Sequence, residues 1–270
     1  MDIASIIGTI LGVVLLGGAM FMAASAGGLS VGLYWDLTSA IIVLGGSLAA
    51  TAIAFPLPKV IAVFKLMGMV FQKPPWEQKE LAQKIIELSA VARKNVKDLQ
   101  GEMDGIRNWF LKDGVQFIID GVQPDEIKEM MELREETREE KESSEANVMK
   151  KMGDFSPAFG MVGTLIGLVI MMFSMGGGGE GGDDDGGGMA ARLGTSMGVA
   201  LITTFYGALF ANLIFLPFSE KLKSKNEENK KVQALIIEGV NLLAKKVHPI
   251  MVTERLNSYL QPADRIRGEE

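Results

Sequence analysis

Threonine hydroxyls occur inside two long apolar segments of this chain, where their oxygen atoms could act as ligands for a cation. Residues 154–172 read DFSPAFGMVGTLIGLVIMM and contain Thr164, and residues 195–218 read TSMGVALITTFYGALFANLIFLPF and contain Thr203 and Thr204. A sodium ion needs several oxygen ligands to replace its hydration shell, whereas a proton needs a carboxylate and a chain of water. We therefore interpret these hydroxyls as a candidate ion pathway. The alternative is that each bonds a backbone carbonyl one turn earlier in its own helix.

The same two segments contain glycines at spacings that allow helices to approach closely. Gly160, Gly163 and Gly167 lie in the first segment, and Gly207 lies in the second. Small residues four positions apart let helix backbones come together in a bilayer. Packing alone would account for these glycines, but close packing would also bring the threonines of the two helices together.

A carboxylate is missing from this arrangement. The four apolar segments of the chain hold no Asp or Glu well inside them; Asp36 lies at the outer edge of the second and Asp154 at the inner edge of the third. Ion-conducting helices usually carry an ionisable residue at membrane depth. We expect another chain to supply the central carboxylate.

The elements that position these residues are four apolar segments, at about 3–26, 37–55, 155–175 and 193–216. Each has roughly the 20 residues that a helix needs to cross about 30 Å of hydrocarbon. No Lys or Arg precedes the first segment and it lacks a clear small-x-small cleavage site, so it favours a retained helix over a signal peptide. The expected fold is an all-α membrane protein with four transmembrane helices and a helical cytoplasmic domain.

The basic residues predict the orientation. Of 27 Lys and Arg, all but Arg192 lie in residues 56–154 and 218–270, on the same side of the expected membrane. By the positive-inside rule these parts and both termini are cytoplasmic. We divide the chain into spans one and two (1–55), a helical cytoplasmic domain (56–154), spans three and four (155–217) with a Gly/Asp-rich outer loop at 176–188, and a helical cytoplasmic tail (218–270).

Both cytoplasmic parts show apolar stripes at helical spacing. After Pro124 a long charged helical pattern runs toward the third span without a break signal. The stripe residues are Leu81, Ile85, Leu88 and Val91 or Ala92 in the middle part, and Leu235, Ile236, Val240 and Leu243 in the tail.

Other function classes find little support. The chain has no P-loop, no cysteine and a single histidine, His248, which we expect to be a surface or capping residue, so neither an enzyme nor a metal site is indicated. Both cytoplasmic parts mix acidic and basic residues, which argues against nucleic-acid binding. The acids of the outer loop, Glu180 and Asp183 to Asp185, either concentrate cations near an entrance or, as we favour, belong to a solvated linker.

Three stretches carry a family resemblance: YWDLTSAIIVLGGS, DFSPAFGMVGTLIGLV and MGVALITTFYGALFANLIFLP. They resemble the signature spans of the flagellar stator A subunits, the MotA/PomA family, with the sodium-type PomA branch most similar. The resemblance covers nearly the whole chain. It implies a bacterial inner-membrane protein of the flagellar motor, not an enzyme. Five such A subunits would surround B subunits whose single membrane aspartate carries the ion.

The resemblance also implies roles for particular residues. Pro157 and Pro217 match the family's prolines at the cytoplasmic ends of spans three and four, which are thought to couple ion passage to movement. The remaining matches are Thr164, Thr203, Thr204 and Asp36 for the ion pathway, and Arg93, Lys94, Glu102 and Asp104 for contact with the rotor's switch complex. Without the resemblance, these four charges would be interpreted as a solvated helix face.

The implied coupling ion is sodium, with a proton as the alternative, and no tightly bound cofactor is expected. Two other functions are alternatives. ExbB and TolQ are energy-transducing channel subunits that resemble three-span proteins with an external amino terminus. A structural membrane scaffold would explain the packing glycines but neither the clustered hydroxyls nor the paired prolines.

Overall fold

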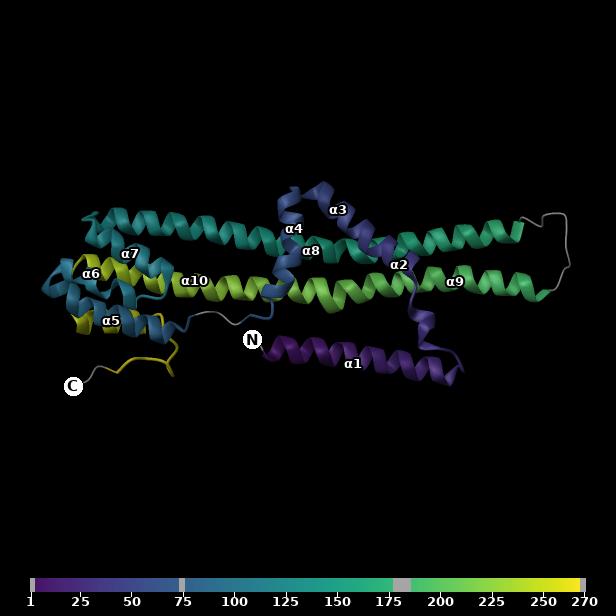
Figure 1. The fold of residues 1–270 in the computed structure, drawn as a ribbon, viewed down its shortest axis with the longest axis horizontal. Coiled ribbons are helices and arrows are strands. Elements are labelled where there is room, and N and C mark those ends of the chain that lie inside the picture. Colours follow the sequence, from purple (N-terminus) through teal and green to yellow (C-terminus); the bar gives the residue numbers. More distant parts are fainter. Residues whose placement is uncertain (1–2, 73–75, 177–185, 268–270) are drawn as a thin grey trace. The chain divides into compact units, whose positions relative to one another are not determined.

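The computed structural model describes residues 3–72, 76–176 and 186–267 (Figure 1). Every regular element in these ranges is a helix, as expected for an all-α membrane protein. The chain divides into two compact units. We call residues 1–72 and 144–222 the membrane unit, and residues 73–143 and 223–270 the second unit. These limits differ from the sequence-based boundaries at 55/56, 154/155 and 217/218, which describe membrane position rather than packing and remain predictions.

Within the described residues, four helical segments are long and apolar enough to cross a membrane, and their apolar cores lie in the membrane unit. The first half of this unit contains α1 (Ile3–Ala26), the 3-10 turn η1 (Val31–Tyr34), α2 (Leu37–Ala40), the π turn η2 (Ile41–Gly45), α3 (Gly46–Ala54) and α4 (Leu57–Met69). The second half contains parts of α8 (Pro124–Gly176) and α10 (Leu216–Ala244), with α9 (Gly186–Leu209) and the π turn η5 (Phe210–Phe215).

Two of the spans are not regular α-helices. The second span passes through the π turn η2, and the fourth passes through η5, which ends two residues before Pro217. At the end of η5 the N–H of Leu216 donates to the carbonyl of Ala211, five residues earlier. A proline cannot donate a hydrogen bond, and its ring crowds the carbonyl four residues before it. A widened turn at this point accommodates the ring, and such turns are frequent at functional sites.

Helix α4 was not anticipated as a separate element. It begins after Pro56 and packs its buried face, including Val63 and Leu66, against Met149 of α8 and Phe218 of α10. Its opposite face is exposed. Helix α4 therefore packs as part of the membrane unit, although the sequence placed it in the cytoplasmic domain.

Helix α1 makes few contacts within the unit. None of the 18 residues in its most apolar window is buried, although Gly12 lies against Leu213 of η5. A helix that is apolar all round must be covered by lipid or by another protein. Its exposed side chains are therefore a surface for one of these.

The second unit is built around its own apolar core. It contains α5 (Gln78–Lys94), η3 (Val96–Asp98), α6 (Leu99–Glu102), η4 (Met103–Gly105), α7 (Trp109–Ile119), α11 (Pro249–Asn257) and parts of α8 and α10. All the expected stripe residues of α5 and α10 are buried here, with Ala92 rather than Val91 completing the first stripe. Local capping fixes the connections: Asn108 accepts hydrogen bonds from the N–H groups of Phe110 and Leu111, and His248 caps α11.

The outer loop expected at 176–188 lies largely outside the described residues. Gly176 ends α8 and Gly186 begins α9, so the described helices include both edges of that stretch. The four loop acids fall in the part that the structure does not describe.

Candidate ion pathway and hinges

The third and fourth spans meet along a line of glycines, where α8 and α9 run side by side (Figure 1). A Cβ atom at Gly160 would lie 3.0 Å from the carbonyl oxygen of Thr203, and one at Gly207 would lie 2.7 Å from that of Ser156. A Cβ at Gly167 would lie 2.9 Å from the Ser196 carbonyl oxygen. The two backbones thus touch, which confirms the close approach predicted from the glycine spacing.

The close approach brings two of the three threonines together. The hydroxyls of Thr164 on α8 and Thr204 on α9 are hydrogen bonded to each other. Thr164 Oγ1 also lies 3.0 Å from the carbonyl oxygen of Ala200 and 3.1 Å from that of Gly160. Four oxygen atoms from two helices therefore gather at one point. Since each hydroxyl has one hydrogen and two lone pairs, the group retains acceptor capacity for a cation.

Thr203 is placed differently from its neighbour. Its side chain is fully buried, packs on Gly163 of α8 and donates a hydrogen bond of 2.8 Å to the carbonyl of Ala200 in its own helix. Thr204 is exposed and Thr164 half-buried. Thr203 thus fills the helix contact, while the other two threonines reach the surface of the seam.

The surface around the threonine pair is apolar and open. Leu201 and Ala208 lie one turn to either side of Thr204 and are exposed, as is Met161 one turn before Thr164. A continuous exposed apolar surface on a membrane span marks a contact with lipid or with another protein. We call this surface, centred on Thr164 and Thr204, the seam face.

Asp36 lies apart from the seam, at the start of the second span. Its carboxylate caps α2 by accepting hydrogen bonds from the N–H and the hydroxyl of Ser39. Tyr206 of α9 accepts from the Asp36 N–H at 3.3 Å and donates to the Tyr34 carbonyl at 2.6 Å. The Asp36 side chain thus caps the second span, while the Tyr206 side chain ties the backbone at its start to the fourth span.

The two prolines lie where α8 packs against the fourth span and the start of α10. Pro157 has no N–H, so the carbonyl of Gly153 loses its usual donor four residues later. A Cβ at Gly153 would lie 2.9 Å from the Leu216 side chain, next to Pro217, and one at Gly207 would lie 3.2 Å from the Pro157 Cα. Each weakened helix segment thus packs against the other helix. We call Pro157 and Pro217 the hinge prolines.

The four charges expected at the rotor contact lie at the end of α5 and in the turns that follow it. Arg93 and Lys94 occupy the last turn of α5 and are exposed, as is Asp104 in η4. Within the described part of the chain these three form no ion pair. Glu102 of α6 is half-buried and pairs with Lys84 at 3.3 Å.

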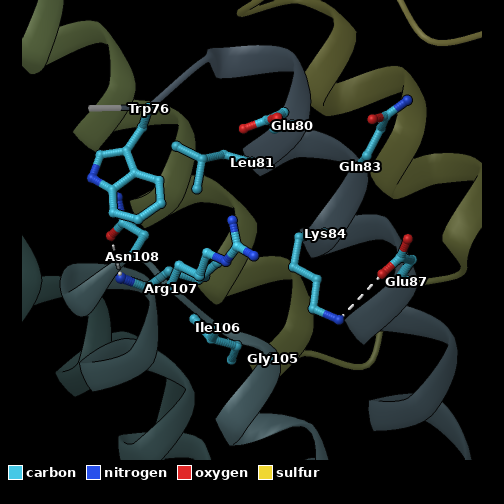
Figure 2. Close-up of a pocket in the computed structure, with 11 residues that line it drawn as sticks. Trp76, Glu80, Leu81, Gln83, Lys84, Glu87, Gly105, Ile106, Arg107 and Asn108 are labelled. Carbon is cyan, nitrogen blue, oxygen red and sulfur yellow. Dashed lines mark hydrogen bonds and ion pairs between the residues drawn. The ribbon is translucent and has the colours of Figure 1, made fainter. Parts of the chain in front are cut away.

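Lys84 was not anticipated from the sequence. It pairs with both Glu87, at 3.2 Å, and Glu102, and it lies beside a cleft between α5 and the turn before α7 (Figure 2). Burial lowers the pKa of Lys84, but hydrogen bonds to the two carboxylates and their charges raise it more, so that its pKa lies above the ordinary 10.5. The cleft is lined by Trp76, Glu80, Leu81, Gln83, Lys84, Glu87, Gly105, Ile106, Arg107, Asn108 and Leu111.

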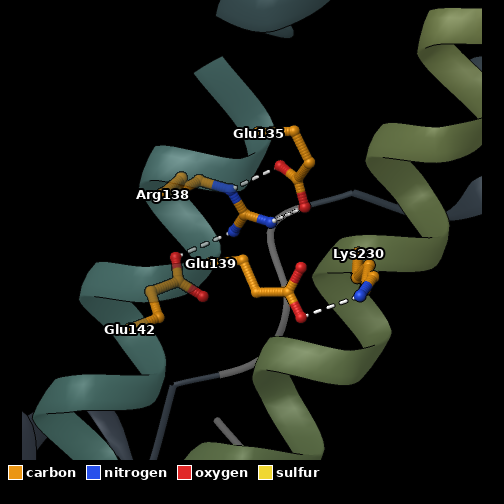
Figure 3. Close-up of polar contacts among 5 residues, drawn as sticks. All are labelled: Glu135, Arg138, Glu139, Glu142 and Lys230. Atoms are coloured by element: carbon orange, nitrogen blue, oxygen red, sulfur yellow. Dashed lines mark hydrogen bonds and ion pairs between the residues drawn. The ribbon is translucent and has the colours of Figure 1, made fainter. Parts of the chain in front are cut away.

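A second charge cluster occupies α8 and α10 in the second unit (Figure 3). The guanidinium of Arg138 donates two hydrogen bonds to Glu135, at 2.7 and 2.9 Å, and one to Glu142 at 2.8 Å. Lys230 of α10 donates to Glu139 at 2.8 Å. Glu135 and Glu142 lie three and four residues from Arg138, and this spacing could have indicated their pairs with it. The partner on α10 could not be found from spacing.

The chain is similar to known proteins along nearly its whole length. A sequence profile of the MotA/TolQ/ExbB proton channel family matches residues 102–233. "Motility protein A" of Borreliella burgdorferi is 33% identical over 269 residues, covering 98% of this chain and 96% of the relative. "Chemotaxis protein PomA" of Vibrio alginolyticus is 32% identical over 267 residues, covering 98% of each.

A solved structure resembles the whole chain. The flagellar MotAB stator complex of Bacillus subtilis contains a chain that matches with a TM-score of 0.82 at 25% identity, covering 97% of this chain and 98% of that one. Proteins of this kind are channel subunits rather than enzymes. Sequence and fold agree along nearly the full length, and this chain belongs to the MotA/PomA family of flagellar stator subunits.

Proposed function

We propose that this chain is the A subunit of a flagellar stator, in which it forms a cation channel with a one-span B subunit and converts cation flow into torque on the rotor. The observation that carries this proposal is the seam face: a hydroxyl pair in an open apolar surface, on spans that contain no carboxylate. A membrane helix carrying an aspartate fits such a surface. The B. subtilis relative is part of a complex named MotAB, which supports a partner of this type.

Sodium is the coupling ion that we propose. The support is the group of four oxygens formed by Thr164, Thr204, Gly160 and Ala200, which together with a partner carboxylate would supply most of a sodium coordination shell. The similarity to PomA agrees with this choice. With a proton as coupling ion, the hydroxyls would serve only to bond the helices.

We further propose a pentamer of this chain in the bacterial inner membrane, with both termini in the cytoplasm. The support for the orientation is that all Lys and Arg except Arg192 lie in the two expected cytoplasmic parts. The exposed apolar surface of α1 would then face lipid or a neighbouring copy. Arg93, Lys94 and Asp104, which are exposed, would contact the rotor's switch complex.

The proposed function is tested by cation flux. Proteoliposomes that contain this chain and a B subunit should take up cations, while this chain alone should not, because a bare cation cannot cross hydrocarbon without a compensating charge. In a host lacking its own stator, the pair should restore rotation. Specific flux through the purified chain alone would refute the proposed dependence on a partner carboxylate.

The choice of ion is tested separately with Thr164→Ala. Rotation of the wild type should depend on external sodium at fixed pH, and Thr164→Ala should shift this dependence to higher sodium. Thr9→Ala is the matched control, because Thr9 is also half-buried in a spanning helix and also bonds the carbonyl four residues earlier, at 2.8 Å. Rotation of the wild type that ignores sodium would leave the proton as coupling ion, and equal behaviour of the two variants would remove Thr164 from the site.

A further inference from the structure

Each hinge proline has a serine beside it whose side chain is fully buried. Ser156 directly precedes Pro157, and Ser219 follows Pro217 by two residues. Burying a hydroxyl is unfavourable unless it is hydrogen bonded. We therefore ask which groups on neighbouring helices these two serines bond.

Ser156 connects the third span to the second. Its hydroxyl donates to the carbonyl of Met152 at 2.8 Å and lies 3.2 Å from the hydroxyl of Ser47 on α3. The single hydrogen of Ser47 is shared between Ser156 and the carbonyl of Val43, which is 2.5 Å away in the same span as Ser47. Ser47 is also fully buried. The contact joins residues that are 109 positions apart in sequence, at the point where Pro157 interrupts the backbone bonding of α8.

Ser219 connects the fourth span to the third. Its hydroxyl donates a bond of 2.8 Å to the carbonyl of Ala146, which is 73 positions away on α8 and completely buried. Pro217 and the π turn η5 leave this start of α10 with fewer regular backbone bonds. The Ser219 bond therefore holds α10 to α8 just beyond the hinge.

Among the described residues of the membrane unit, Thr164, Thr204 and Tyr206 also bond across helices, whereas several other hydroxyls bond only their own helix. Thr9 and Thr51 bond a carbonyl of their own helix four residues earlier, which is the ordinary behaviour of such side chains. Of the buried hydroxyl bonds that do cross, two lie beside the hinge prolines. A proline lets a helix bend at the missing backbone bond, and a cross-helix bond beside it makes the neighbouring helix follow.

We propose that Ser219, and Ser156 together with Ser47, are positioning residues that transmit movement at the hinge prolines from one helix to the next. This inference rests on the proposed stator function. Ions would still pass along the seam face without these bonds. The helices on either side of each hinge would move independently, so that less of each ion's passage would be converted into rotation.

The test compares rotation with ion uptake in cells that lack their own stator and express this chain with its B subunit. Stall torque of tethered cells and cation uptake are both measured and divided by the amount of complex in the membrane. Ser219→Ala and Ser156→Ala should each lower torque at least two-fold, while cation uptake should differ from that of the wild type by no more than about 20%. Thr51→Val is the matched control: it removes a fully buried hydroxyl that bonds only its own helix.

A double substitution checks the Ser47–Ser156 contact. If the two residues act through their mutual bond, Ser47→Ala with Ser156→Ala should lower torque per ion no further than Ser156→Ala alone. Torque and uptake that fall in proportion, or variants that match Thr51→Val, would overturn the inference. A wild type that neither conducts nor rotates would instead refute the proposed function, so the two failures are distinguishable.

Discussion

Replacing Gly207 by alanine tests whether the seam between α8 and α9 depends on direct backbone contact. The added Cβ would lie 2.7 Å from the Ser156 carbonyl oxygen, 3.1 Å from the Gly160 Cα and 3.2 Å from the Pro157 Cα. All three are backbone atoms, so no side chain can rotate to make room. The two helices must separate or shift along each other.

The expected cost follows from a comparison with Gly198, which lies nine positions earlier in α9 and has nothing within 4 Å of an added Cβ. Alanine in place of glycine favours a helix by up to about 1 kcal/mol at either position. Overpacking at Gly207 opposes this gain by about 1–3 kcal/mol. The difference in unfolding free energy between the two variants isolates the overpacking, because the helix term is common to both.

The assay is thermal unfolding of the detergent-purified chain, together with rotation in a host lacking its own stator. For a chain of this size 1 kcal/mol corresponds to about 2–4 °C in Tm. Gly207→Ala should therefore unfold several degrees below Gly198→Ala. It should also impair rotation, because separating the helices pulls Thr164 from Thr204. If the two variants share one Tm and rotate alike, the seam is not in backbone contact and our reading of the glycines is wrong.

Two further predictions concern the charges of the second unit. Exposed charge pairs contribute only about 0–1 kcal/mol each, so several must be reversed together to weaken the rotor contact. The triple variant Arg93→Glu, Lys94→Glu, Asp104→Lys should reduce rotation strongly, and compensating reversals on the rotor should restore part of it. A triple variant that rotates normally would show that these residues belong to a solvated face. The raised pKa of Lys84 means that its pairs with Glu87 and Glu102 stabilise the fold below pH 10.5 and stop doing so as the pH rises through that higher pKa. Unfolding free energies of the wild type and Lys84→Met should therefore differ most below pH 10.5 and converge as the pH rises through the raised pKa of Lys84. A difference that stays constant through this range would show that Lys84 acts through packing instead.

The sequence was most informative where one physical requirement dominates. Spans could be found because a bilayer demands about 20 apolar residues, and the burial of Leu81, Ile85 and Leu88 followed from helical periodicity. The glycines of the seam were identifiable because small residues at this spacing have few other uses in a membrane helix.

Other features depend on contacts that periodicity does not encode. Thr203 and Thr204 are adjacent, so only the rotation of α9 decides that one is buried and the other exposed. In an apolar span this rotation leaves no pattern, since every face is hydrophobic. The bond from Ser219 to Ala146 joins distant residues through a carbonyl, which every residue type possesses. The ion pair of Lys84 with Glu102 likewise depends on how a chain turn folds back on α5.

The π turn η5 has a consequence for how the fourth span can change during evolution. A π turn accommodates one residue more than the α-helix around it, and one residue corresponds to about 100° of rotation about the helix axis. In a regular α-helix the additional residue would rotate α10 by that angle and turn Ser219 away from Ala146. The widened turn absorbs the residue instead, so deleting one residue from Phe210–Phe215 would restore a regular helix and leave both Thr204 and Ser219 facing their partners. The fourth span can therefore gain or lose a residue at this turn without changing the angle between its ion-facing surface and the tail.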